Sequence, residues 1–266
     1  MWQTFIIEPF TNVLLWIYSL MANVPGAFGW AIILFTILIR AITWPLNAQQ
    51  LKGAQAMQEL QNDKDWQAIQ KKYAKDKEKL AQEQMRVYKE KGINPFSSCL
   101  PTVIQFPIII GLYQAIIRAL ASAPLGMLQL ARSVKPEILG IPFLNAAALI
   151  PLNSHFLWMD LSQPESISIF GFSLPTLAII VAITTYIQSK LTMPATANPG
   201  DQSAAMGKTM SIYMPLLLGY FALTFASGLS VYFITSNALG IFQYAVTGRA
   251  NWRNLLPGGD KLAKAK

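Results

Sequence analysis

Five apolar segments constrain the fold of this chain more than any other feature of its sequence. Each is 17–21 residues long and carries at most one charge, and they cover residues 28–46, 100–120, 172–191, 209–225 and 228–247. A helix rises about 1.5 Å per residue, so segments of this length can cross the hydrocarbon core of a bilayer. We therefore expect an all-α integral membrane protein with five transmembrane helices.

The composition agrees with burial in a membrane. Charged residues make up 13% of the 266 residues, whereas a soluble domain carries about 25%. Cys99 is the only cysteine and His155 the only histidine, so neither an intramolecular disulfide nor a zinc site is expected. We expect no cofactor.

The charges that are present gather in residues 47–93. This segment holds ten of the 21 Lys and Arg residues and seven of the 13 Asp and Glu residues. Apolar residues recur there at helical spacing, which predicts a solvated hairpin of two amphipathic helices. The hairpin can turn at residues 62–65 or near Asp76, and Gly92 with Asn94-Pro95 closes it.

Two other apolar segments are too short or too rich in proline to be expected to cross the membrane as a helix. Within residues 1–27 an apolar stretch of about 15 residues ends at Pro25-Gly26, which favours an interfacial helix, with a span as the alternative. Residues 121–171 contain five prolines, so a sixth span is disfavoured and an extracytoplasmic loop with short interfacial helices is expected.

Basic residues set the orientation. The hairpin, Lys190, the loop 192–208 and the tail 248–266 share one side of a five-span protein and hold 17 of the 21 basic residues. By the positive-inside rule that side is cytoplasmic, with the C-terminus there and the N-terminus outside. No transit peptide is seen, so we expect the bacterial cytoplasmic (plasma) membrane.

Arg40 is a charged residue in the middle part of an apolar segment, and it is the strongest single indication of function in the sequence. It lies about 18 Å into the first apolar segment, where an arginine costs about 2.5–3.5 kcal/mol on insertion scales. None of the 13 acidic residues falls within the five segments, and arginine stays charged. Water, hydroxyls, amides or carbonyls must therefore solvate it, which predicts a hydrated cavity. Snorkelling of the side chain towards the headgroups is the alternative.

Further polar residues fit the same cavity. Thr36, Arg40, Thr43 and Asn47 share one helical face, and the last segment carries polar residues on two neighbouring faces. Any one of them is more typical of a helix–helix hydrogen bond, but as a set they predict a hydrophilic groove. The predicted groove residues are Arg40, Thr36, Thr43, Gln105, Thr184, Gln188, Tyr232 and Ser236.

Three methionines form a second pattern. Met206, Met210 and Met214 recur every four residues near the cytoplasmic end of the fourth segment. Flexible thioethers adapt to varied apolar surfaces, so we predict contact with a substrate helix. Ordinary packing or lipid contact is the alternative.

Several motifs together resemble the YidC/Oxa/Alb family of membrane protein insertases. They fall in order over most of the chain: Thr36-Ile37-Leu38-Ile39-Arg40, Trp44-Pro45-Leu46, Asn94-Pro95, Cys99-Leu100-Pro101, Ile104-Gln105-Phe106-Pro107, Leu112-Tyr113, Phe156 to Ser162, Ser227-Gly228-Leu229, Tyr232 and Ser236-Asn237. The chain departs from the family at Ala226, where a proline is common, and at Phe233, where many members have an aromatic hydroxyl.

The resemblance implies a five-helix core around a groove that opens to the cytoplasm and to lipid, with Arg40 as the groove arginine. It implies a membrane protein insertase and chaperone, not an enzyme, which receives short hydrophilic segments in the groove and releases them laterally into lipid. The implied partners are nascent membrane proteins, membrane lipid, the ribosome, the signal-recognition machinery and the Sec translocon. The basic hairpin and tail would also suit ribosomal RNA.

Two rival classes have less support. A small transporter usually carries intramembrane acids or internal repeats, and this sequence has neither. An intramembrane enzyme would need a nucleophile with a base or a metal, and the spans offer no such pair.

Overall fold

The computed structural model describes residues 2–73, 76–93, 100–120, 126–128, 130, 152–169, 172–192 and 202–247. Most of them are helical, as expected. In this part of the chain two helices, in Ala27–Gln49 and Ser227–Val246, are long and apolar enough to span a membrane, and Thr176–Leu191 and Ser211–Thr224 form shorter apolar helices. The count of five spans stays a prediction.

The chain divides into two compact units. The first unit comprises Met1–Ile42, Gln105–Thr184 and Leu216–Leu239, and the second comprises Thr43–Ile104, Thr185–Pro215 and Gly240–Lys266. Several helices therefore contribute one end to each unit.

The N-terminal region is helical over Gln3–Leu20, and whether it lies on the membrane or spans it stays a prediction. A short π-helix, Gln3–Ile7, leads into α1, Glu8–Leu20. Gly26 then adopts a positive φ of 71°, which an L side chain rarely tolerates, and α2 begins at Ala27.

Helix α2 corrects one expected boundary. It runs without interruption from Ala27 to Asn62, with Pro45 inside it, so no helix end lies at residue 46. Proline removes one backbone hydrogen bond and its ring crowds the preceding turn, but the following turns are rich in Ala, Gln and Leu, which favour helix. The first arm of the hairpin is therefore a continuation of the helix that carries Arg40.

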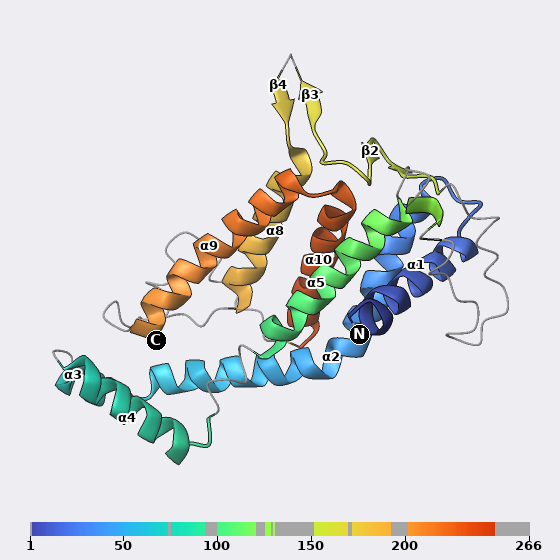
Figure 1. The fold of residues 1–266 in the computed structure, drawn as a ribbon. Coiled ribbons are helices and arrows are strands. Elements are labelled where there is room, and N and C mark those ends of the chain that lie inside the picture. Colours follow the sequence, from blue (N-terminus) through green and yellow to red (C-terminus); the bar gives the residue numbers. More distant parts are fainter. Residues whose placement is uncertain are drawn as a thin grey trace. The chain divides into compact units, whose positions relative to one another are not determined.

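Beyond the charged hairpin, the described apolar helices are α5, Leu100–Ala119; α8, Thr176–Thr192; α9, Gln202–Thr224; and α10, Ser227–Val246 (Figure 1). Helix α8 begins four residues later than the expected start at 172, because Phe172–Leu174 is a strand and Pro175 follows it. Helix α9 begins seven residues before the expected start at 209.

The loop before α8 contains strands, so the all-α expectation is wrong there. Strand β1, His155–Phe156, pairs with β2, Met159–Asp160, and β3, Ile167–Ile169, pairs with β4, Phe172–Leu174, both antiparallel. Tight turns and β-branched or aromatic residues favour such hairpins. Within residues 121–151, where interfacial helices are expected, the structure describes residues 126–128 and 130, which are helical. Residues 193–201 of the loop 192–208 and the tail 248–266 lie outside the described residues.

The core of the first unit joins helices that are far apart in sequence. Leu14 of α1, Phe28 and Ile32 of α2, Leu112 of α5 and Leu229 of α10 are all buried in one apolar cluster. Edge-on aromatic contacts add specificity, among them Phe10 with Phe35, at 5.4 Å between ring centroids. This core fixes α10 beside α2 and α5.

The β1–β2 hairpin is bonded to the start of α10. The Ser227 hydroxyl donates to the Asp160 carbonyl at 2.6 Å, and the Ser227 N–H donates to the Gln163 carbonyl at 2.8 Å. The Gly228 N–H donates to the Leu161 carbonyl at 3.1 Å. The loop thus supplies acceptors for N–H groups that the first turn of a helix leaves unpaired.

The second unit contains the charged hairpin. Helix α3 spans Lys64–Lys72 and α4 spans Lys77–Glu90, so the chain breaks at both of the positions that the sequence offered. Asp63 caps α3 and also pairs with Lys91. The hydrogen bond from Lys91, followed by those from the backbone of Trp66 and Asp65, lowers the pKa of Asp63.

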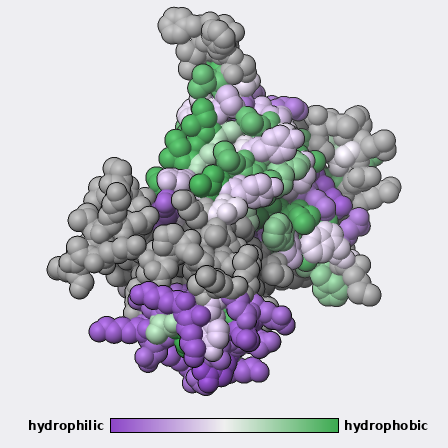
Figure 2. Space-filling view, turned by 90° about the vertical axis from the view of Figure 1, so that its left-hand side faces the viewer, coloured by the Kyte–Doolittle hydropathy of each residue, from purple (hydrophilic) through white to green (hydrophobic). Residues whose placement is uncertain are grey.

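The hairpin has its own small core. Leu60, Trp66, Val87 and Tyr88 are buried together. The outer surface is hydrophilic, and in Figure 2 the described atoms of this hairpin form a mostly purple group. This part of the hairpin therefore consists of two separate helices, α3 and α4, with one apolar and one hydrophilic side, and its cytoplasmic location stays a prediction.

The packing of Phe156 on α2 predicts a large effect of a small substitution. A Cβ at Gly29 would lie 2.2 Å from the Phe156 ring, so Gly29→Ala should lower the unfolding free energy by about 1–3 kcal/mol. Gly219→Ala is the control, because its Cβ would meet Ala182 at 3.3 Å and alanine favours helix. Chemical unfolding in detergent micelles measures both, and equal stability would contradict this packing.

Candidate functional site

The site is built around Arg40 of α2 and Ser236 of α10. The Arg40 Nε donates to the Ser236 hydroxyl at 3.0 Å, and Nη2 donates to the same hydroxyl at 2.6 Å and to the Ser236 carbonyl at 2.8 Å. Arg40 is half-buried and Ser236 is buried. Both acceptors are neutral, so these bonds orient the guanidinium without cancelling its charge.

A second polar contact lies one helical turn away. The Gln105 side-chain amide of α5 donates to the Tyr232 hydroxyl of α10, and Tyr232 is 2% exposed. Tyr232 precedes Ser236 by four residues, so the two hydroxyls share one face of α10. This face therefore carries polar contacts to both α5 and α2.

Helix α8 reaches α10 through a third contact. The Asn237 amide donates to the Thr184 hydroxyl at 3.1 Å, and Asn237 is buried. Asn237 was not among the predicted groove residues, although its place on a polar face of the last span is the signal that finds it. Ser230, seven residues before it, has a buried hydroxyl without a hydrogen-bond partner in the described part of the chain.

Two predicted residues on α2 bond within their own helix. Thr36 is fully buried and donates to the Ile32 carbonyl at 2.6 Å, because a threonine in a helix can use the carbonyl four residues back. Thr43 accepts from the Asn47 amide at 3.5 Å. Neither contact joins them to Arg40 or to another helix.

Gln188 of α8 lies against Gly240 of α10. Its amide nitrogen would be 2.6 Å from a Cβ at position 240, so the glycine leaves the space that the carboxamide occupies. Both residues belong to the second unit.

The structure describes only one of the three methionine side chains that were predicted to contact a substrate helix. Met206 and Met210 lie in α9, but their side chains fall outside what the structure describes, and Met214 is half-buried. The predicted contact with a substrate helix stays a prediction.

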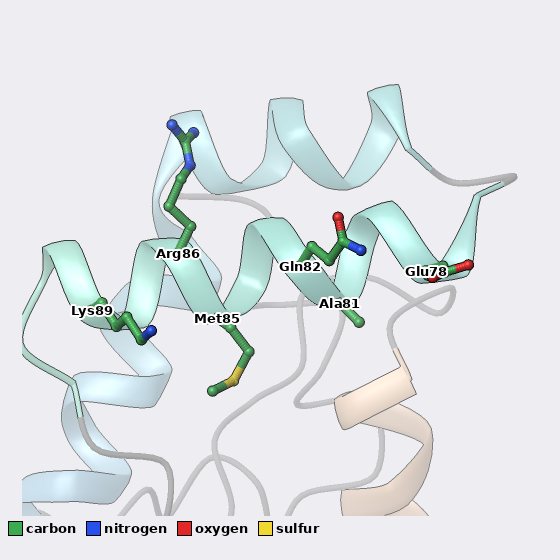
Figure 3. A pocket seen from close by; sticks show the side chains of 6 residues that line it. All are labelled: Glu78, Ala81, Gln82, Met85, Arg86 and Lys89. Carbon is green, nitrogen blue, oxygen red and sulfur yellow. The ribbon is translucent and has the colours of Figure 1, made fainter.

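A shallow depression runs along α4. In Figure 3 Met85 and Lys89 project to one side of the helix and Arg86 to the other, and the lining residues are Glu78, Ala81, Gln82, Met85, Arg86 and Lys89. Arg86 pairs with Glu83 at 2.8 Å and with Glu90 at 3.7 Å. Met85 is 47% exposed, so this face presents an apolar centre among charges.

These contacts bring one positively charged side chain together with several neutral hydrogen-bonding groups. Among the residues that the structure describes, no group of three His, Cys, Asp or Glu side chains could hold a metal ion. What the arrangement offers is a fixed cation on α2 beside hydroxyl and amide groups of α5, α8 and α10.

Comparison with known proteins gives a consistent result. The family model described as 60Kd inner membrane protein matches residues 20–253. The membrane protein insertase YidC of Oceanobacillus iheyensis is 32% identical over 253 residues, which cover 91% of this chain and 81% of that protein. Membrane protein insertase YidC 1 of Halalkalibacterium halodurans is 34% identical, with coverages of 93% and 79%.

A solved structure agrees with the sequence relatives. It is a crystal structure of an active YidC insertase with its first transmembrane domain resolved, at a TM-score of 0.53 and 27% identity. The similarity covers 90% of this chain and 45% of that chain.

The Arg40–Ser236 contact predicts an energetic coupling between α2 and α10. Hydrogen bonds to charged groups contribute about 1.5–3 kcal/mol, and partial exposure of Arg40 reduces this, so Ser236→Ala should destabilise the protein by about 1 kcal/mol. In an Arg40→Gln background the same change should cost less. A double-mutant cycle from unfolding in micelles measures the difference, and strict additivity would show that the Ser236 hydroxyl does not bond Arg40.

Proposed function

The chain belongs to the 60Kd inner membrane protein family, and from this membership we infer that it is a membrane protein insertase of the bacterial cytoplasmic membrane. We propose further that it works through a hydrated groove centred on Arg40. The groove would receive short hydrophilic segments of nascent membrane proteins from the cytoplasmic side and release the attached helix into lipid.

The contact between Arg40 and Ser236 carries this proposal. Arg40 follows Ala27, the start of α2, by 13 residues, which corresponds to about 20 Å along the helix. A guanidinium at such depth is costly unless polar groups or water reach it. The hydroxyl and carbonyl of Ser236 meet part of this need, and water entering the groove would meet more of it.

The other helices supply polar groups around the same stretch of α10. Gln105 bonds Tyr232, and Thr184 bonds Asn237. The unpartnered Ser230 hydroxyl would add a site for water. Together these groups favour a polar route over a uniformly apolar bundle.

Electrostatics explains how the groove would act. Coulomb attraction strengthens as the effective dielectric constant falls. Arg40 would therefore attract an acidic segment into the groove more strongly than it would in bulk water. The membrane potential, worth about 2.3 kcal/mol per charge per 100 mV, would then favour its outward transfer. No bond is made or broken.

Lateral release requires an apolar path beside the groove. Helix α9 exposes Leu216, Tyr220 and Leu223, at 64%, 60% and 45% of their surfaces. Apolar surface of this kind would contact lipid or a departing substrate helix.

The hairpin is the proposed contact for cytoplasmic partners. The exposed Met85 on α4, with Lys89 on the same side of the helix, would suit an apolar segment of a nascent chain or a surface of the ribosome. Signal-recognition machinery and the Sec translocon are further partners that we propose from the family resemblance.

Replacing Arg40 tests the groove directly. Arg40→Ala should impair insertion of a single-span substrate with an acidic tail far more than insertion of its neutral-tailed counterpart, and Arg40→Lys should retain much of the activity because it keeps the charge. Insertion into vesicles containing the purified protein is the measurement. Equal loss for both tails would contradict the electrostatic role, and solute flux through the same vesicles would favour a channel.

A further inference from the structure

The β1–β2 hairpin separates its apolar side chains into two groups. Phe156 and Met159 are 6% and 4% exposed, whereas Leu157 and Trp158, which form the turn between them, are 72% and 57% exposed. Phe156 packs edge-on against Trp30, with 5.8 Å between ring centroids. The hairpin is thus held by its strand residues, while its turn presents two large apolar side chains outward.

The backbone conformation of the turn is unfavourable for a leucine at position 157. Leu157 has a φ of 54° and is the non-glycine residue with positive φ in the described part of the chain. A two-residue hairpin turn with this conformation favours Asn, Asp or Gly. Stability of the turn therefore does not account for a leucine, and its exposed side chain calls for another explanation.

The hydrogen bonds of this loop place the turn near the ends of two apolar helices. Besides the bonds from Ser227 and Gly228 of α10, Glu165 accepts from the Thr176 hydroxyl at 2.8 Å and from the Leu177 N–H at 3.0 Å, both at the start of α8. The Trp158 indole donates to the same carboxylate at 3.3 Å. The turn therefore lies close to the points where the chain enters α8 and α10.

The acidic residues of the loop do not oppose contact with lipid. Asp160 accepts from the Ser162 N–H at 2.9 Å and from its hydroxyl at 2.7 Å. Burial opposes ionisation of Asp160, but these bonds lower its pKa. Glu165 is occupied by α8 and Trp158, so both carboxylates are engaged within the protein.

We propose that Leu157 and Trp158 insert into the lipid interface, at the level of the headgroups and the first acyl carbons, and anchor the β1–β2 hairpin to the leaflet where α8 and α10 begin. Tryptophan suits this level because its ring is apolar and its N–H is polar. The anchor holds the loop that closes the ends of these helices. This inference does not depend on the groove, and it stands whether or not Arg40 receives substrate.

Spin labelling tests the depth of the turn. The protein, as a Cys99→Ser variant carrying Leu157→Cys, is labelled with a nitroxide and reconstituted into phosphatidylcholine–phosphatidylglycerol vesicles. Collisions with oxygen, which concentrates in lipid, are compared with collisions with a water-soluble nickel chelate. Labels at Ile183→Cys on α8 and Lys89→Cys on α4, both at exposed positions, provide the lipid and water references.

The expected result at position 157 is a clear excess of oxygen collisions, intermediate between the two references. An excess of nickel collisions would overturn the proposal, because the turn would lie in water. An immobilised label that neither reagent reaches would also overturn it, because protein, such as a second copy of the chain, would then cover the turn.

A substitution at the turn separates anchoring from folding. Leu157→Asn should leave the melting temperature in detergent micelles unchanged or raise it, because asparagine suits the backbone. In vesicles, the same substitution should reduce the ratio of oxygen to nickel collisions of a label at Trp158→Cys several-fold. A lower melting temperature, or an unchanged collision ratio, would contradict the anchor.

Discussion

The cost of holding a guanidinium within a membrane governs the rest of this structure. Arg40 cannot lose its charge, so its helix must either bring polar groups to it or leave it open to water. The structure supplies Ser236 from α10, through a hydroxyl and a main-chain carbonyl. Helix α10 must therefore lie against α2, and the buried core of Phe28, Ile32 and Leu229 keeps it there.

Helix α10 is the element on which the first unit converges. Its start is bonded to the loop around Asp160, and its middle carries Tyr232, Ser236 and Asn237, which contact α5, α2 and α8. An apolar helix with so many hydrogen bonds to its neighbours is fixed in rotation as well as in position. A fixed set of polar groups is what a groove needs if it is to lower the cost of transferring a hydrophilic segment.

The sequence predicted much of this arrangement because membrane helices obey simple rules. Length and apolarity predicted a mostly helical chain, and two of the described helices are long and apolar enough to span a membrane. The single arginine of the first span and the polar residues of the last span predicted a polar contact, and Arg40 does bond Ser236. The Thr36 hydroxyl bonds the Ile32 carbonyl of its own helix, and spacing along a helix cannot distinguish such a bond from a contact across helices, so its place in the groove stays a prediction. The continuation of α2 through Pro45 and the strand Phe172–Leu174 depend on tertiary context, which periodicity does not encode. The capping of α8 by Glu165 could not be predicted either, because it depends on the conformation of the loop between Glu165 and Thr176.

Water access at the depth of Arg40 tests the central claim most directly. In a Cys99→Ser background, Arg40→Cys should react with a membrane-impermeant thiol reagent applied from the cytoplasmic side. Leu38→Cys, on the opposite face of α2 and 40% exposed in the structure, should not react, because lipid would surround it. Protection of the cysteine at position 40, with reactivity no greater than at position 38, would contradict a hydrated groove.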